Sequence, residues 1–293
     1  MLTVFAPAKL NLTLEVLAKR QDGFHEVRSI AQTINLCDSL HFQVSWNIEF
    51  SCTDPDWTPG KSLVSKAADL LQKTAGCSKG ATVEVDKRIP LVSGLSGDSS
   101  DAAATLRGLN RLWGLGLSQK ELLGLAAQLG SDVAFFLYGG TALLEGRGEI
   151  VTPLPPFPHR WVVLMMPPVP SKPGKTARLY GSVRANHYTD GQITDKFITH
   201  LTGGRELASY KVFNVFDNVA QGSFSGLDKY WQQFLKAGAA DVHLAGSGPV
   251  LFTLVRDKSQ AEDLYLRLKQ QRIESYLIDT LTAIDYIDEE PYN

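Results

Sequence analysis

The chain has 293 residues, of which 44% are hydrophobic and 20% are charged, and its formal net charge is -2. This composition is typical of one large or two medium-sized globular domains. The balanced charge excludes a broad basic surface for nucleic acid or for an anionic membrane. No apolar run approaches the roughly 18 to 20 residues that span a bilayer, and the first residues lack the charged leader of a signal peptide. We therefore expect a cytoplasmic protein, monomeric or homodimeric, that acts on small molecules and has no nucleic-acid or membrane partner.

The three cysteines, Cys37, Cys52 and Cys77, show neither a CxxC pattern nor the spacing of metal ligands. An odd number of widely separated cysteines in a cytoplasmic chain favours reduced thiols over disulfides. We expect free thiols and no metal site built from cysteine.

In chain order, alternation of apolar residues predicts strands over Asn11–Leu17 and Ala81–Val85. Apolar residues at helical spacing between 102 and 113 predict a helix after a glycine-rich loop. Ser118–Glu121 is a capping-box pattern, so a second helix is expected to begin there and to end near Gly130.

Two proline-rich stretches, residues 153–158 and 167–173, flank the apolar run Trp161–Met166. Proline breaks helices and removes hydrogen-bond donors from a sheet, so this pattern predicts a domain boundary followed by the first strand of a second domain. We expect domains over residues 1–155 and 156–293. Residues 260–269 carry apolar side chains on one helical face and are expected to cover the second sheet.

The loop Pro90–Ala104 is rich in glycine and serine and leads directly into the alanine-rich helix. Small residues allow a tight turn that brings several main-chain N–H groups to one anion, and the start of the helix adds its positive dipole end. The pattern predicts a phosphate-binding loop and thus a phosphoryl-transfer enzyme. The alternative is an ordinary polar loop in which Ser99 or Ser100 caps the helix.

Lys9 and Asp132 are the candidate catalytic pair. A carboxylate that accepts the proton of a substrate hydroxyl, beside an ammonium that favours its ionised form, suits phosphoryl transfer. Each residue also has a structural explanation: Lys9 as an edge lysine with a buried stem, and Asp132 as a helix N-cap. Sequence spacing leaves both explanations open.

Together, several segments resemble the superfamily of galactokinase, homoserine kinase, mevalonate kinase and phosphomevalonate kinase (GHMP kinases), and within it the 4-diphosphocytidyl-2-C-methyl-D-erythritol kinases. The matching segments occur in the family's order over nearly the whole chain: residues 7–12, 23–26, 95–103, 130–136, 139–142, 146–149 and 245–249. The glycine-rich loop and the Gly-Ser-Gly segment are shared by the superfamily. Residues 23–26, followed by Thr176 and Tyr180, are more particular to the cytidyl family.

The resemblance implies an α+β fold of two domains, an N-terminal βα domain with the phosphate loop and a C-terminal ferredoxin-like domain, with the active site between them. It implies ATP-dependent phosphorylation of the 2-hydroxyl of 4-diphosphocytidyl-2-C-methyl-D-erythritol in the non-mevalonate isoprenoid pathway, with Asp132 as the base and Lys9 as its partner. Metal-bound ATP, with Mg²⁺ as the metal, would contact Lys87 near the adenosine and Gly94, Ser96, Gly97, Ser99 and Ser100 at the phosphates. The turn Gly246, Ser247 and Gly248 would support the loop.

For the substrate, the resemblance implies that Asn11 lies near the reacting hydroxyl, that His25 meets the edge of the base, and that Arg147 meets the diphosphate. Phe24 and Tyr180 are the candidate stacking faces, because an aromatic ring offers a base roughly 1–3 kcal/mol of stacking. If the family resemblance is set aside, Phe24 and Tyr180 are interpreted as core residues and His25 as an ordinary polar histidine. Arg147 is then a solvated side chain, and residues 246–248 form a simple tight turn.

The loop departs from the family's pattern, which has glycine at the positions of Val92, Ser96 and Asp98. Valine tolerates positive φ poorly, so we expect either a different turn at Val92 or a position that does not need the left-handed conformation. The Asp98 carboxylate either points away from the phosphates, stabilised by the helix dipole, or helps to hold Mg²⁺; we favour the first. Ser62, where relatives tend to have asparagine, is expected to loosen the adenine contact.

Two further hypotheses stay open, and the loop departures motivate the first of them. The first is a non-catalytic nucleotide-binding homologue, which the presence of both Lys9 and Asp132 disfavours. The second is a related kinase of mevalonate or homoserine, whose substrate lacks a base and would not require Phe24, His25 and Tyr180.

Overall fold

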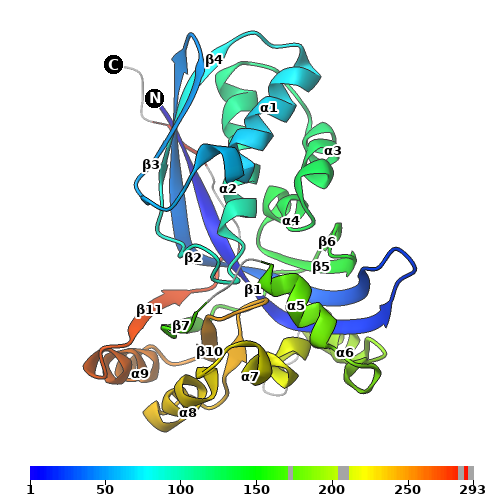
Figure 1. Cartoon of the computed structure of the whole chain (residues 1–293), viewed down its shortest axis with the longest axis vertical. Helices are drawn as coiled ribbons and strands as arrows, with labels where there is room; N and C mark the ends of the chain where they lie inside the picture. Colours follow the sequence, from blue (N-terminus) through cyan, green and yellow to red (C-terminus); the bar gives the residue numbers. More distant parts are fainter. Residues whose placement is uncertain (171–173, 204–210, 283–286, 290–293) are drawn as a thin grey trace.

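A computed structural model of the chain describes residues 1–170, 174–203, 211–282 and 287–289. Two β-sheets lie one below the other along the long axis of the molecule, each with its own helices (Figure 1). In the described ranges, no helix combines the length and the apolar character that crossing a membrane requires. The three cysteines are free thiols, as expected.

The first sheet contains eight strands in the order β12-β1-β2-β4-β3, with β5 and β6 continuing from β2 and β8 beside β1. Its strands are β1 (Leu2–Lys19), β2 (His25–Ser45), β3 (Ile48–Cys52), β4 (Gly80–Asp86), β5 (Thr141–Gly146), β6 (Ile150–Pro153), β8 (Phe213–Asn214) and β12 (Ile287–Glu289). The strands predicted over Asn11–Leu17 and Ala81–Val85 are confirmed within β1 and β4.

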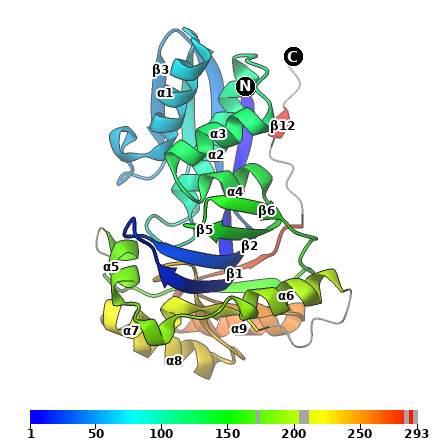
Figure 2. The same ribbon diagram turned by 90° about the vertical axis from the view of Figure 1, so that its right-hand side faces the viewer.

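Helices α1, α2 and α3 cover one face of the first sheet (Figure 2). The helical elements of this half are η1 (Pro59–Lys61), α1 (Leu63–Ala75), α2 (Gly97–Leu112), α3 (Gln119–Leu129) and α4 (Val133–Tyr138). The predicted capping box is confirmed, because the Ser118 side chain accepts from the Glu121 N–H and the Glu121 carboxylate accepts from the Ser118 N–H. The helix ends at Gly130, also as predicted. Buried Trp113 and Phe42 join the sheet and helices into one core.

The second sheet has the strand order β11-β7-β10-β9 and is antiparallel throughout. Its strands are β7 (Trp161–Met166), β9 (His243–Leu244), β10 (Leu251–Val255) and β11 (Glu274–Asp279). The other elements of this half are α5 (Lys175–Ser182), η2 (Ala185–His187), α6 (Gln192–Thr202), η3 (Val215–Asn218), α7 (Ala220–Ser223), α8 (Leu227–Ala237) and α9 (Lys258–Gln270). The succession β7, α8, β9, β10, α9, β11 is the ferredoxin-like β-α-β-β-α-β order, so the predicted α+β class and second-half architecture are confirmed.

Helix α9 buries Ala261, Leu264 and Leu268 in the same cluster as Val163 and Leu251 of the second sheet. The predicted covering role of residues 260–269 is therefore confirmed. Each large aliphatic side chain taken out of water there contributes roughly 1.5–3 kcal/mol.

Chain segments from the second half also reach the first sheet. Strand β8 pairs in parallel with β1. Beyond β11, Thr280 bridges Ile34, and the Leu281 N–H donates to the Thr33 carbonyl at 3.0 Å. The boundary between residues 155 and 156 stays a prediction.

Candidate active site

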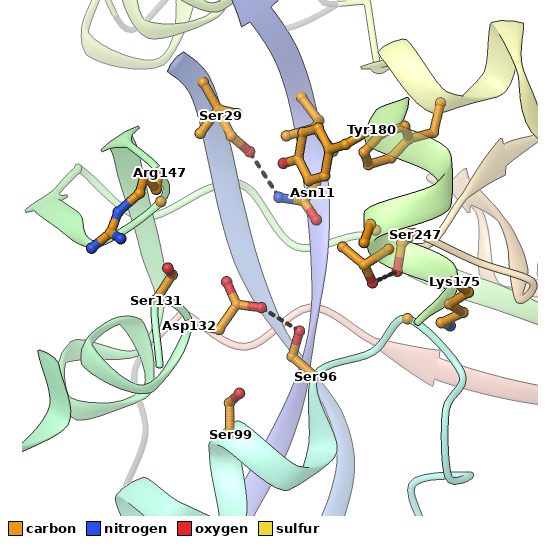
Figure 3. Close-up of a pocket in the computed structure, with 18 of the residues that line it drawn as sticks. Asn11, Ser29, Ser96, Ser99, Ser131, Asp132, Arg147, Lys175, Tyr180 and Ser247 are labelled. Carbon is orange, nitrogen blue, oxygen red and sulfur yellow. Dashed lines mark hydrogen bonds between the residues drawn. The ribbon is translucent and has the colours of Figure 1, made fainter. Parts of the chain in front are cut away.

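A cavity of about 920 Å³ is lined by residues from both halves of the chain. Its position agrees with the preference of ligand sites for the junction between domains. The predicted site residues that line it are Lys9, Asn11, Phe24, His25, Lys87, Gly94, Ser96, Gly97, Ser99, Asp132, Arg147, Thr176, Tyr180, Gly246 and Ser247. Figure 3 shows part of this set. Ser100 and Gly248 are the predicted residues that do not line the cavity.

The phosphate loop, residues 90–96, leads into α2 through a series of left-handed residues. Val92 has φ 53°, Gly94 φ 94° and Ser96 φ 59°. The expectation for Val92 is wrong: the position adopts the left-handed conformation despite the β-branched side chain, which is 58% exposed. The alternative that Ser99 or Ser100 caps the helix is also wrong, because Ser96 is the N-cap residue and its side chain makes no capping hydrogen bond.

Strand β1 holds the loop at two points. The Lys9 N–H donates to the Leu95 carbonyl at 3.1 Å, and the Ser100 hydroxyl donates to the Pro7 carbonyl at 2.7 Å. Ser100 is only 1% exposed, so its hydroxyl faces the strand rather than the cavity. The pairing of β1 with β2 shifts register between Pro7 and Ala8, a bulge that suits a residue with no N–H to donate.

The loop also packs directly against the Gly-Ser-Gly turn. A Cβ on Gly94 would lie 2.1 Å from the Ala245 carbonyl oxygen, and a Cβ on Gly246 would lie 2.6 Å from the Gly94 carbonyl oxygen. These contacts require glycine on both sides. The two motifs, about 150 residues apart in the sequence, therefore form one wall of the cavity.

Lys9 and Asp132 meet in the cavity. The Lys9 ammonium lies 3.5 Å from the Asp132 carboxylate. The same carboxylate accepts a hydrogen bond from the Ser96 hydroxyl at 2.6 Å (Figure 3). Although Asp132 is the N-cap residue of α4, its side chain makes no capping hydrogen bond. Lys9 is 4% exposed in the middle of β1, so it is not an edge lysine. The geometry thus removes the structural explanation for each residue.

A buried hydrogen-bond chain orients the Lys9 side chain. The Lys9 ammonium donates to Asn11 Oδ1 at 3.1 Å, and Asn11 Nδ2 donates to the Ser29 hydroxyl at 2.7 Å. Ser29 in turn donates to the Thr13 carbonyl. Each side chain of this series is bonded to the next, which fixes the ammonium next to Asp132.

Lys87 reaches the cavity wall, but two buried carboxylates hold its ammonium. It forms hydrogen-bonded ion pairs with Asp38 and, at 2.7 Å, with Asp101, whose side chains are fully buried. Burial alone would lower the pKa of Lys87, but the carboxylates of Asp101 and Asp38 outweigh it and raise that pKa. Burial raises the pKa of Asp101 well above its usual range, against the effect of Lys87. Sequence reasoning missed both acids, because neither lies near Lys87 along the chain.

The aromatic residues lie at one end of the cavity, in an arrangement that differs from two open stacking faces. The His25 and Tyr180 rings stack on each other, with centroids 5.0 Å apart and an interplanar angle of 16°. The Arg147 guanidinium lies over the Phe24 ring, 4.9 Å from its centroid. Burial and the Lys19 charge lower the pKa of His25, so its imidazole is neutral near pH 7, with one donor and one acceptor nitrogen.

Asp98 and Ser62 are joined to each other. Asp98 Oδ1 accepts hydrogen bonds from the Ser62 hydroxyl and from the Leu63 N–H, both at 3.1 Å. Ser62 is the N-cap residue of α1 and accepts from the Val64 N–H. The carboxylate therefore interacts with the positive ends of α1 and α2, as the favoured interpretation of a helix-terminal acid requires. Sequence reasoning had treated these two departures as independent.

Val92 allows a test of backbone strain. A left-handed conformation costs an L-residue roughly 1–2 kcal/mol, whereas glycine costs roughly 0.5–1 kcal/mol in chain entropy. We expect Val92→Gly to raise the free energy of unfolding by about 0.5–1 kcal/mol in urea titrations. Val44→Gly, at an exposed valine within β2, should lower it by a similar amount. A loss of stability in both variants would contradict the strain at Val92.

Comparison with known proteins agrees with this architecture. Residues 62–140 match the family described as GHMP kinases N terminal domain, and residues 205–274 match GHMP kinases C terminal. A relative from Dehalococcoides mccartyi, named 4-diphosphocytidyl-2-C-methyl-D-erythritol kinase, is 50% identical over 285 residues, which cover 97% of this chain and 100% of the relative. A relative of the same name from Geobacillus thermodenitrificans is 40% identical, with 92% of this chain and 93% of the relative covered.

Solved structures agree as well. A crystal structure of 4-(cytidine 5'-diphospho)-2C-methyl-D-erythritol kinase superimposes with a TM-score of 0.80 at 28% identity, covering 95% of this chain and 98% of the other. Homoserine kinase from Cytophaga hutchinsonii, at 20% identity and a TM-score of 0.71 with 96% and 95% covered, shares the fold. On this evidence the chain belongs to the 4-diphosphocytidyl-2-C-methyl-D-erythritol kinase family of the GHMP kinases.

Proposed function

We propose that this protein transfers the γ-phosphoryl group of ATP to the 2-hydroxyl of 4-diphosphocytidyl-2-C-methyl-D-erythritol, giving the 2-phosphate and ADP. The observation that carries the proposal is the Lys9 and Asp132 pair, placed beside the phosphate loop by Ser96. The names of its relatives supply the substrate.

In the proposed reaction the substrate hydroxyl oxygen attacks the γ-phosphorus while the bond from that phosphorus to the ADP oxygen breaks. The Asp132 carboxylate accepts the hydroxyl proton and later releases it to solvent. The Lys9 ammonium, fixed by Asn11, stabilises negative charge that develops on the transferred group.

The ATP phosphates are proposed to bind the loop and the first turn of α2, at Gly94, Ser96, Gly97 and Ser99. Ser100 is a weaker candidate, because its hydroxyl is bonded to Pro7. Lys87 would approach the adenosine from a fixed position in its carboxylate cluster.

Mg²⁺ is proposed to enter with the nucleotide. Among the described residues, no cluster of three or more His, Cys, Asp or Glu side chains is arranged to hold a metal. Mg²⁺ fits such a site when the nucleotide phosphates and water supply most of its ligands, with the Ser99 hydroxyl available at the cavity wall. When bound, the ion would neutralise charge on the phosphates.

The cytosine is proposed to bind beside His25 and Tyr180. The stacked pair offers a flat aromatic surface, and the neutral imidazole offers one donor and one acceptor to the base edge. The Arg147 guanidinium covers the Phe24 ring, so Phe24 could stack on the base only if the guanidinium moved aside or stacked together with the base. The guanidinium is suited to binding the substrate diphosphate. Thr176, which shares a 2.9 Å hydrogen bond with Ser247, would meet the substrate beside the Gly-Ser-Gly turn.

A coupled assay tests the proposal. Purified protein with Mg-ATP and the cytidyl substrate should release ADP, and phosphorus NMR should place the new phosphate on the 2-oxygen. Mevalonate and homoserine should give values of kcat/KM lower by at least about 10²-fold, since neither carries a base to fill the aromatic end. Equal rates on all three acceptors would overturn the cytidyl assignment, and nucleotide binding without turnover on any acceptor would favour the non-catalytic homologue.

A further inference from the structure

Lys175, the first residue of α5, is a buried cation in the wall of the cavity. It is 8% exposed, and its ammonium donates to two main-chain carbonyls, that of Val92 at 2.6 Å and that of Gly248. One carbonyl belongs to the phosphate loop and the other to the Gly-Ser-Gly turn. Figure 3 shows Lys175 close to Ser247 of that turn. The side chain thus bridges two segments that the chain itself joins only over a long distance.

No acid neutralises this cation in the part of the chain that the structure describes. The segments it contacts, residues 89–97 and 245–250, contain no ionisable side chain. On α5 the nearest charged residue is Arg178. The carboxylate of Asp132 is bonded to Ser96 and lies next to Lys9, and that of Asp98 is bonded to Ser62. Burial lowers the pKa of Lys175 to about 8.

A buried and unpaired ammonium is unfavourable for folding. The two carbonyls that accept hydrogen bonds from Lys175 are main-chain groups at a cavity wall, where water can donate to them instead. Their hydrogen bonding therefore does not require a lysine. The bridge is also attached at Val92, the β-branched one among the three left-handed residues of the loop. Lys175 therefore places a buried charge, which is unfavourable for folding, next to the residue whose left-handed backbone is also unfavourable.

Few other polar contacts hold the loop to the turn. The Val250 N–H donates to the Ser93 carbonyl at 3.3 Å, and the contact between Gly94 and Gly246 adds close packing. The two hydrogen bonds from Lys175 are charge-assisted and hence stronger than a neutral pair. They fix the direction in which the loop presents its N–H groups.

We infer that Lys175 is a positioning residue that locks the phosphate loop to the Gly-Ser-Gly turn and so orders the site for the β- and γ-phosphates of a nucleotide. The inference depends on one part of the proposed function, namely that the cavity binds a nucleoside triphosphate. It does not depend on which acceptor is phosphorylated.

Calorimetric binding of AMP-PNP and of AMP, both without acceptor, tests the inference. Lys175→Met should weaken AMP-PNP about tenfold and AMP by less than about twofold, while Lys175→Arg should retain most of the affinity. Lys236→Met, at an exposed lysine of α8, is the matched control and should bind both ligands as the wild type does. The ratio of wild-type to Lys175→Met affinity for AMP-PNP should fall as pH rises through about 8, because the wild-type ammonium loses its charge there.

The melting temperature separates positioning from a structural role. At pH 7, Lys175→Met should melt no lower than the wild type, because the variant no longer buries an unpaired cation. Two binding results for Lys175→Met would overturn the inference: an unchanged affinity for AMP-PNP, or an equal loss of affinity for AMP. A melting temperature lower by more than about 5 °C, together with a parallel loss of affinity for both ligands, would also overturn it. If Lys175→Met does not fold, Lys175→Arg and the wild-type pH profile give the same test. Failure to phosphorylate the cytidyl substrate, with these binding results intact, would overturn the proposed function alone.

Discussion

Replacing Asp132 with asparagine is expected to lower kcat by a factor on the order of 10³, the range that a positioned general base contributes. Asparagine keeps the size of the side chain and can accept the hydrogen bond from Ser96, but it cannot take the hydroxyl proton. Binding of AMP-PNP should change little, because the loop contacts are main-chain groups. Steady-state ADP release and calorimetric nucleotide binding measure the two effects separately.

The matched control for this variant is Asp263→Asn, at an exposed acid of α9. It should retain wild-type kcat. Lys9→Met should lower kcat as well, because it removes the ammonium 3.5 Å from Asp132. If the Asp132 variant kept more than about a tenth of the wild-type kcat, the base would be assigned wrongly, since that loss is too small for general-base catalysis. A parallel loss of nucleotide affinity would instead assign Asp132 to ATP binding.

The local patterns of the sequence predicted the local structure well. The period of Asn11–Leu17, the capping box at Ser118 and the apolar face of residues 260–269 each depend on interactions within a few residues. Such interactions are visible in a single stretch of sequence. The phosphate loop and the pair of Lys9 and Asp132 were predicted from residue types. The other cavity residues were predicted from the family resemblance, whose motifs preserve positions that no periodicity marks.

The rest depends on contacts between distant segments. Val92 is left-handed and exposed, and its main-chain carbonyl accepts a hydrogen bond from Lys175. Lys175 belongs to the second half of the chain, so the loop sequence does not reveal this contact. The partnership of Ser62 with Asp98 exists because the N-termini of α1 and α2 come together. In the sequence alone, Val92 and Asp98 are departures from the loop pattern of the family. In three dimensions both have partners.

The second large effect concerns stability. Lys87→Met is expected to lower the free energy of unfolding by about 3–5 kcal/mol, because it leaves buried acids without their cation. The Lys87 side chain is 4% exposed, and those of Asp38 and Asp101 are fully buried. Asp101→Asn should cost much less, about 1 kcal/mol, because Lys87 keeps Asp38 as its counter-ion and the asparagine oxygen can still accept a hydrogen bond from the ammonium. Urea denaturation at pH 7 gives both values, and a loss below about 1 kcal/mol in Lys87→Met would contradict the pairing.

The pH dependence of this loss follows from the direction of the Asp101 shift. A carboxyl whose pKa is raised on folding binds a proton more tightly in the native state, so its contribution to stability declines as pH rises above 3.8, the usual value for aspartate. Removal of Lys87 takes away the charge that opposes this rise, so the cost of Lys87→Met should be smaller at pH 5 than at pH 8.

Adding Asp38→Asn to Lys87→Met should recover part of the loss, because the pair is then removed together rather than broken. Strict additivity of the two substitutions would mean that Asp38 and Lys87 do not interact. The cluster also bears on the site, since Lys87 Nζ lies close beneath Gly97, where a Cβ would be 3.4 Å from it. Lys87 therefore packs against the first turn of α2 at Gly97, while Lys175 binds the main-chain carbonyl of Val92 in the loop. Loss of Lys87 should then weaken AMP-PNP binding even at pH 5, where much of the stability is retained.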